Sequence, residues 1–381
     1  MQGSRSKILI KLVPVVLILI LGALLLSVGK LSVLHGRDDA LYKAVQKSDL
    51  AAVKTLLSEH ADPNVRAPVS FSWMFWKNHA DDFHASALRC AVEQAVANSN
   101  LAKPGTGAVP AADEQAIVAA LLDAGAHAAP DDGGQNLLEW TLTNGSNRLT
   151  LATDALLKHG VPLPATLSGQ PLLAGAINWR TPPATIDTLL HAGADAKGAA
   201  GRAALAAAYR QWDRTYSHQE VLVIMRSLLA AGADPNTPID QLPILYDALR
   251  WHHSEIVPLL LQAHAAPNPA LPAGVLPLLY VALDSRPEVL QQLLDAGADP
   301  NVHEQNGEPV LWYAVIHAIS EKPEDKARKV ELLLAHGANV HARWGERTVQ
   351  EAAHRDAKDY HIAPAILALL DRAAAGTKPS R

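Results

Sequence analysis

The chain has 381 residues and a formal net charge of −5 with histidine counted as neutral. Hydrophobic residues make up 49% of it and charged residues 19%, which is too apolar a balance for a disordered chain. The small negative charge gives no basic footprint for nucleic acid. The single cysteine excludes an internal disulfide and a thiolate metal site. Because that cysteine, Cys90, lies in the apolar helical pattern "SALRCAVEQA", we expect it to be a small buried side chain.

The N-terminal region contains a nearly continuous apolar run over residues 8–28, with a short polar segment over 1–7 before it and a linker over 29–37 after it. A helix of about 21 residues spans roughly 30 Å, or one hydrocarbon core. The run therefore predicts a transmembrane signal anchor. A cleaved signal peptide and a buried soluble helix remain as alternatives.

Basic residues lie on both sides of this run, with Arg5, Lys7 and Lys11 at its start and Lys30 and Arg37 after it. The excess at the front favours a cytoplasmic N-terminus and an exported remainder. The predicted localisation is a bacterial inner membrane, crossed once, with the rest of the chain in the periplasm. The opposite orientation, a cytoplasm-facing membrane scaffold, stays open.

From residue 38 onward one short phrase recurs, for example "LLSEHADPNV" at 56–65, "LLAAGADPNT" at 228–237 and "LLDAGADPNV" at 293–302. Successive copies are commonly about 33 residues apart, a period that indicates an array of helical repeats. Upstream of each leucine pair a second phrase, such as "PILYDAL" or "PLLYVAL", predicts another short helix. Each unit is therefore expected to be two helices joined by a turn and followed by a loop.

A glycine follows the second helix in most copies, where a positive φ is needed to end the helix. These structural repeat glycines are Gly125, Gly160, Gly193, Gly232, Gly297 and Gly337. His60 and His264 take the same place in two other copies, and histidine is one of the few residues that tolerate it. The Asp-Pro-Asn sequences that come after, as at 62–64, supply turn chemistry for the loop.

These residues resemble the ankyrin repeat, whose phrase runs T-P-L-H-x-A and ends in L-L-x-x-G-A-D-x-N. The resemblance covers roughly 38–376 and implies an all-α solenoid of about nine helix-turn-helix units, preceded here by the one transmembrane helix. Five residues of this sequence replace the family's histidine, which ties adjacent loops together: Tyr42, Arg89, Tyr246, Tyr280 and Trp312. Without that histidine, the resemblance predicts irregular repeats.

Two insertions interrupt the period. An inter-helix insertion covers 98–113 and is rich in proline, glycine and alanine. A loop insertion over 66–86 is rich in aromatic side chains, among them Phe71, Trp73, Phe75 and Trp76. Such a loop could cap the first repeat, lie at a membrane interface or anchor a protein partner. A polar tail over 377–381 ends the chain.

Tryptophans also recur near the ends of successive first helices, as Trp179, Trp212 and Trp251, each close to an arginine. In ankyrin folds these helices line the concave face, so the tryptophans are candidates for binding a protein, with packing between repeats as the alternative.

No catalytic or phosphate-binding motif stands out, so we expect no enzyme activity, no cofactor, no metal and no small-molecule substrate. The resemblance instead implies a module that binds a protein client, for example as an immunity or protective partner. An envelope protein that acts by self-association is the alternative function. The sequence does not identify the client or the oligomeric state.

Overall fold

The computed structural model describes residues 36–66, 85–101, 112–128, 137–144, 150–316 and 322–376. The chain divides into two compact units, Met1–Ala194 and Asp195–Arg381. Over the described residues the first unit holds four helix pairs and the second holds five, which is the predicted number of repeats.

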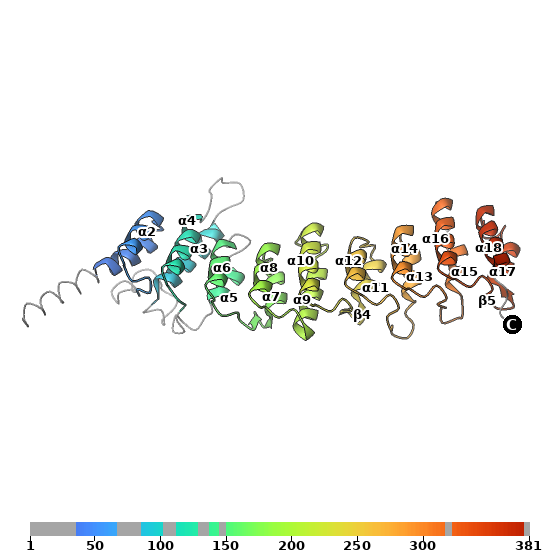
Figure 1. Cartoon of the computed structure of the whole chain (residues 1–381), viewed down its shortest axis with the longest axis horizontal. Coiled ribbons are helices and arrows are strands. Elements are labelled where there is room, and N and C mark those ends of the chain that lie inside the picture. Colours follow the sequence, from blue (N-terminus) through green and yellow to red (C-terminus); the bar gives the residue numbers. More distant parts are fainter. Residues whose placement is uncertain are drawn as a thin grey trace, which may run out of the picture. The chain divides into compact units, whose positions relative to one another are not determined.

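The first described element of the first unit is a helix over 36–46. Its other elements are α2 (Leu50–Ser58), α3 (Ala87–Leu101), α4 (Ala112–Asp123), α5 (Leu137–Asn144), α6 (Thr150–Lys158), β1 (Thr166–Leu167), β2 (Gln170–Pro171), α7 (Leu172–Asn178) and α8 (Pro183–His191). The second helices α2, α4, α6 and α8 pack each against the next, and the first helices α3 and α5 do the same (Figure 1).

The second unit repeats this arrangement with α9 (Gly198–Arg210), α10 (His218–Ala230), β3 (Pro238–Ile239), β4 (Leu242–Pro243), α11 (Ile244–Arg250), α12 (Ile256–Gln262), α13 (Leu278–Leu283), α14 (Pro287–Asp295), α15 (Val310–Ile316), α16 (Pro323–Ala335), β5 (Arg343–Trp344), β6 (Arg347–Thr348), α17 (Val349–Arg355) and α18 (Pro364–Gly376). The first helices α11, α13, α15 and α17 form one row, and the second helices α10, α12, α14, α16 and α18 form the other (Figure 1). Apolar side chains between the two rows make the core.

The repeated leucine phrase is the end of each second helix. At α14, the Ala298 N–H donates to the Leu293 carbonyl at 2.9 Å and the Gly297 N–H donates to the Leu294 carbonyl at 2.9 Å. This is the Schellman arrangement, which requires a left-handed residue, and Gly297 has φ +92°. Leu293 itself is fully buried. One phrase therefore supplies a core side chain and a helix stop together.

The other repeat glycines have the same backbone conformation, as the pattern predicts. Their φ values are +98° at Gly125, +72° at Gly160, +96° at Gly193, +100° at Gly232 and +93° at Gly337. His60 and His264 also lie in the left-handed region, at +65° and +66°.

Short two-stranded ribbons occupy three of the loops that lead into first helices. The β1–β2 turn has positive φ at Ser168 and Gly169, and the β3–β4 turn has positive φ at Asp240 and Gln241. Two successive positive φ values define the turn whose twist matches that of a β-hairpin. A proline then precedes the first helix, as Pro171 does for α7 and Pro243 does for α11.

An asparagine in the loop after the second helix bonds to the next repeat. The Asn301 side-chain amide donates to the Gly337 carbonyl at 3.1 Å, and its carbonyl oxygen accepts from the Asn339 N–H at 2.8 Å. We call this set the asparagine ladder. Its other members are Asn64 with Gly125 and His127, Asn236 with Ala266, and Asn268 with Gly297 and Asp299. The ladder therefore links consecutive repeats through main-chain groups.

The transmembrane helix in the predicted fold class needs correction. Among the residues that the structure describes, no helix is long and apolar enough to cross a membrane. The 15 residues of α3, for example, rise about 22 Å, which is short of a hydrocarbon core of roughly 30 Å. The predicted segment 8–28 lies outside the described residues, as do the flanking segments 1–7 and 29–35 and the tail 377–381. The single-pass membrane localisation is withdrawn with it.

Candidate functional site

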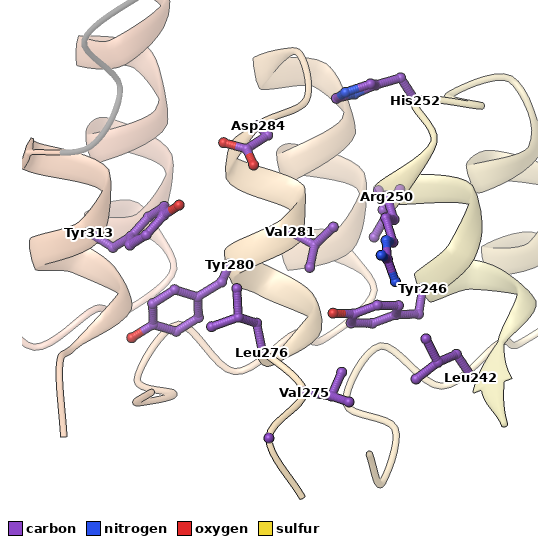
Figure 2. Close-up of a pocket in the computed structure, with 12 residues that line it drawn as sticks. Leu242, Tyr246, Arg250, His252, Val275, Leu276, Tyr280, Val281, Asp284 and Tyr313 are labelled. Atoms are coloured by element: carbon purple, nitrogen blue, oxygen red, sulfur yellow. The ribbon is translucent and has the colours of Figure 1, made fainter. Parts of the chain in front are cut away.

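A groove lies in the second unit along the row of first helices, between α11 and α13 and reaching α15 (Figure 2). Its volume is about 400 Å³, within the range of pockets that hold small ligands or short peptide segments. The residues that line it are Leu242, Tyr246, Leu249, Arg250, His252, Gly274, Val275, Leu276, Tyr280, Val281, Asp284 and Tyr313. Consecutive repeats therefore build it together.

Two tyrosines of the groove take the place of the family's histidine, but their hydroxyls differ in what they bond. The Tyr280 hydroxyl donates to the Glu308 carbonyl and accepts from the Glu304 N–H at 3.0 Å. Tyr280 is only 1% exposed, and burial raises the pKa of its phenol. This tyrosine ties its own helix to the loop of the next repeat, so the irregularity expected without the histidine does not arise here.

Tyr246 is 5% exposed, but its side chain lies in the groove (Figure 2). Its hydroxyl has no hydrogen-bond partner among the residues that the structure describes. Burial raises the pKa of the Tyr246 phenol, and the Arg250 guanidinium acts in the opposite direction. The phenol therefore remains a neutral O–H donor at physiological pH.

Charged side chains lie towards one end of the groove. Arg250 ends α11 and Asp284 caps α13, which are equivalent positions in consecutive repeats. The structure shows no ion pair for either side chain in the described part of the chain. In Figure 2, His252 and Asp284 lie at one end, Val275 and Leu276 lie towards the other, and Arg250 extends towards the Tyr246 ring. One wall is therefore cationic, the other is anionic, and the floor is apolar and aromatic.

Trp251 stands beside this groove. Its side chain is 59% exposed, and the Arg250 guanidinium lies 5.7 Å from the centroid of its ring. Trp179, in the first unit, is 46% exposed and donates from its indole N–H to the Ser168 hydroxyl at 3.1 Å. Both follow a first helix directly, as the sequence predicts.

Trp212 has a different environment from the other two. It is only 4% exposed and stacks on His218 with ring centroids 4.3 Å apart. The Asp213 carboxylate lies 3.5 Å from the His218 Nε2 and 3.3 Å from the His253 Nε2. Burial lowers the pKa of His253, and Asp213 partly offsets that effect. Trp212 thus packs within a cluster formed by the α9–α10 turn and the residues after α11.

The remaining predicted contacts, Phe71, Trp73, Phe75 and Trp76, lie outside the described residues. Residues 102–111 of the inter-helix insertion do as well, although α3 extends through residue 101 and so takes up part of that insertion. In the described residues no group of three or more His, Cys, Asp or Glu side chains could hold a metal ion.

The sequence alone did not predict a groove between α11 and α13, or the approach of Arg250 to the Tyr246 ring. The phrase "RWHH" marked Trp251, with the arginine beside it, as a candidate protein contact, and Arg250 and His252 both line the groove. The tyrosines stood out only as departures from the ankyrin pattern. The one signal for the groove in the sequence was a tyrosine at the same position of two consecutive repeats, Tyr246 and Tyr280.

No protein-family model matches the sequence, and no curated protein matches it. Among solved structures, the chain is similar to the ankyrin repeat domain of Bcl-3, described as a unique member of the IkappaB protein family. That likeness has 20% identity and a TM-score of 0.40, and covers 63% of this chain and 99% of the other. The ankyrin repeat domain of human ASB11 is similar at 18% identity and a TM-score of 0.31, over 78% and 98% of the two chains.

TM-scores of this size do not establish a common fold, so the assignment depends on the repeats themselves. An ankyrin unit has about 33 residues and consists of a turn followed by two helices. In both units of this chain, short helices are paired, left-handed residues end the second helices, and hairpin ribbons lead into first helices. The described residues of this chain form an ankyrin-type repeat fold.

Proposed function

We propose that this chain is a non-catalytic protein-interaction module that binds a protein client through the groove between α11 and α13. The module is assigned to residues 38–376, the span over which the helix pairs recur. A non-catalytic protein that binds a client and covers part of the client's surface fits the role of an immunity or protective partner.

The observation that carries the proposal is the groove with its aromatic and arginine side chains. Tyrosine, tryptophan and arginine are the residues most enriched where protein interfaces concentrate their binding energy. Here Tyr246 and Arg250 line an open volume of about 400 Å³, and an exposed Trp251 lies next to them. An exposed indole held near a guanidinium can bury a large area with little loss of side-chain freedom. Trp179 and the aromatic residues of 66–86 remain predicted contacts of the same module.

Site-specific photo-crosslinking in living cells tests this proposal. A photoreactive phenylalanine analogue replaces Val281, which lines the groove, in the full-length chain. The matched control places the same analogue at Gln292, an exposed position on α14, a second helix. The proposal predicts one discrete adduct with another protein from position 281 and none from position 292.

Three outcomes contradict the proposal. They are no adduct at position 281, the same adducts at both positions, and an adduct whose mass is that of two copies of this chain. The last outcome supports self-association instead. Measuring the mass of the full-length chain in solution over a range of concentrations gives an independent reading of that alternative.

A further inference from the structure

The Tyr246 hydroxyl and the Arg250 guanidinium are two hydrogen-bond donors that line the groove, and neither has an acceptor in the described part of the chain. The Tyr246 hydroxyl belongs to a side chain that is 95% buried, and the groove is the open space it faces (Figure 2). The Arg250 guanidinium extends towards the same ring and is close enough to affect the phenol's pKa. The Tyr246 hydroxyl opens on the groove and the Arg250 side chain is exposed, so an acceptor supplied from outside can reach both donors.

A carboxylate matches this pair of donors best. A guanidinium presents parallel N–H groups that fit the two oxygens of one carboxylate, and a phenol O–H can donate to either oxygen. A neutral carbonyl would satisfy the phenol but would leave the positive charge of Arg250 without a counterion.

The rest of the groove limits what can carry this carboxylate. Asp284 repels a second negative charge at one end, and the side chains of Val275 and Leu276 favour an apolar group towards the other (Figure 2). The groove also extends past the donors as far as Tyr313, so that a chain can continue through it. These features fit an internal, extended peptide segment in which one acidic residue lies next to an apolar one.

We infer that the groove is a carboxylate-binding subsite in which Arg250 and Tyr246 hold one aspartate or glutamate side chain of a peptide segment of the client. This inference rests on the proposed function and names the chemistry by which the client is recognised. It assigns Arg250 the charge and Tyr246 the fixed hydrogen bond, and it makes Asp284 the residue that rejects strongly acidic segments.

The test uses the immobilised full-length chain and a library of random twelve-residue peptides displayed on phage with no free C-terminus. Selected sequences are expected to share a single acidic residue beside an apolar one. The best peptide, synthesised with both ends capped, should lose at least about tenfold in affinity when its acidic residue becomes the amide. Its binding should also weaken as salt concentration rises.

Two groove variants and two matched controls complete the experiment. Tyr246→Phe and Arg250→Gln should each weaken the peptide at least about fivefold, because each removes a charge-assisted hydrogen bond. Tyr360→Phe and Arg226→Gln, which change an exposed tyrosine and an exposed arginine outside the groove, should bind the peptide as the parent chain does.

The inference is overturned if the library gives no enrichment, if selected peptides lack the acidic residue, or if both groove variants bind like the controls. It is also overturned if a peptide that offers only a C-terminal carboxylate binds more tightly than the internal acidic residue. The proposed function fails separately, when no protein adduct forms at position 281. A protein adduct there, combined with peptides that do not depend on an acidic residue, leaves the module standing and removes only the carboxylate subsite.

Discussion

Replacing Tyr280 by phenylalanine removes one hydroxyl and leaves a buried ring in place. That hydroxyl makes two hydrogen bonds, one to the Glu308 carbonyl and one from the Glu304 N–H, and each contributes about 0.5–1.5 kcal/mol net. The Glu304 N–H also donates to the Glu308 carbonyl at 2.9 Å, so neither main-chain group loses all its partners. The larger penalty for a stranded buried group therefore does not apply. We expect a loss of about 1–2 kcal/mol in local stability.

Hydrogen exchange measured by mass spectrometry on the full-length chain detects this loss where it occurs. Opening of the segment around residues 303–309 should become roughly 5- to 30-fold more frequent, the equivalent of about 1–2 kcal/mol. The matched control is Tyr246→Phe, whose hydroxyl has no partner in the described residues, and it should change stability by less than about 0.5 kcal/mol. Unchanged exchange in Tyr280→Phe, or equal losses in both variants, would refute the assignment of the inter-repeat tie to Tyr280.

Three further predictions concern other parts of the fold. Asn301→Ala removes two hydrogen bonds to the next repeat and should cost about 1–2 kcal/mol, seen as faster exchange around 337–341, whereas Asn339→Ala, which removes a bond within its own loop, should not affect the inter-repeat contact. Burial raises the pKa of Cys90 to about 11, so this thiol should resist a disulfide reagent at pH 8 until the chain unfolds; rapid labelling of the native chain would contradict its burial. Burial lowers the pKa of His253 below its ordinary value of 6.5, so its contribution to stability is complete above pH 6.5 and is lost as the pH falls through the folded-state pKa. Urea unfolding between pH 5 and 7 should therefore show a steeper loss in the parent chain than in His253→Gln, and equal slopes would count against this prediction.

The helix pairs and their ends could be predicted from sequence because the responsible interactions are local. The Schellman bonds of α14 join residues within five positions of one another, and the left-handed glycine is a requirement of the backbone alone. The prolines before α7 and α11 and the capping box of Ser217 with Glu220 act over similarly short distances. A pattern of residue types is sufficient to find features of this range.

The groove and the inter-repeat contacts depend on distances in space that a pattern does not contain. Tyr280 finds its partners 24 and 28 residues later, and Asn301 finds one 36 residues later. The Asp-Pro-Asn phrase predicts a turn, which is correct for the aspartate, but the asparagine also bonds to the next repeat. Trp212 and Trp251 look alike in the sequence, although Trp212 is buried and Trp251 is exposed. The difference arises from neighbours that lie in different repeats, which a sequence pattern does not show.

The asparagine ladder has a consequence for how the second unit responds to force. Each amide reaches only one repeat ahead, so its bonds break when two neighbours separate and do not weaken the bonds farther along. A chain stretched from its ends should therefore release its repeats singly, because contacts in such arrays join nearest neighbours. About 33 residues freed at a time correspond to roughly 110–120 Å of added contour length. A pulled molecule should therefore yield in a sawtooth in which each extension step has the length of one repeat.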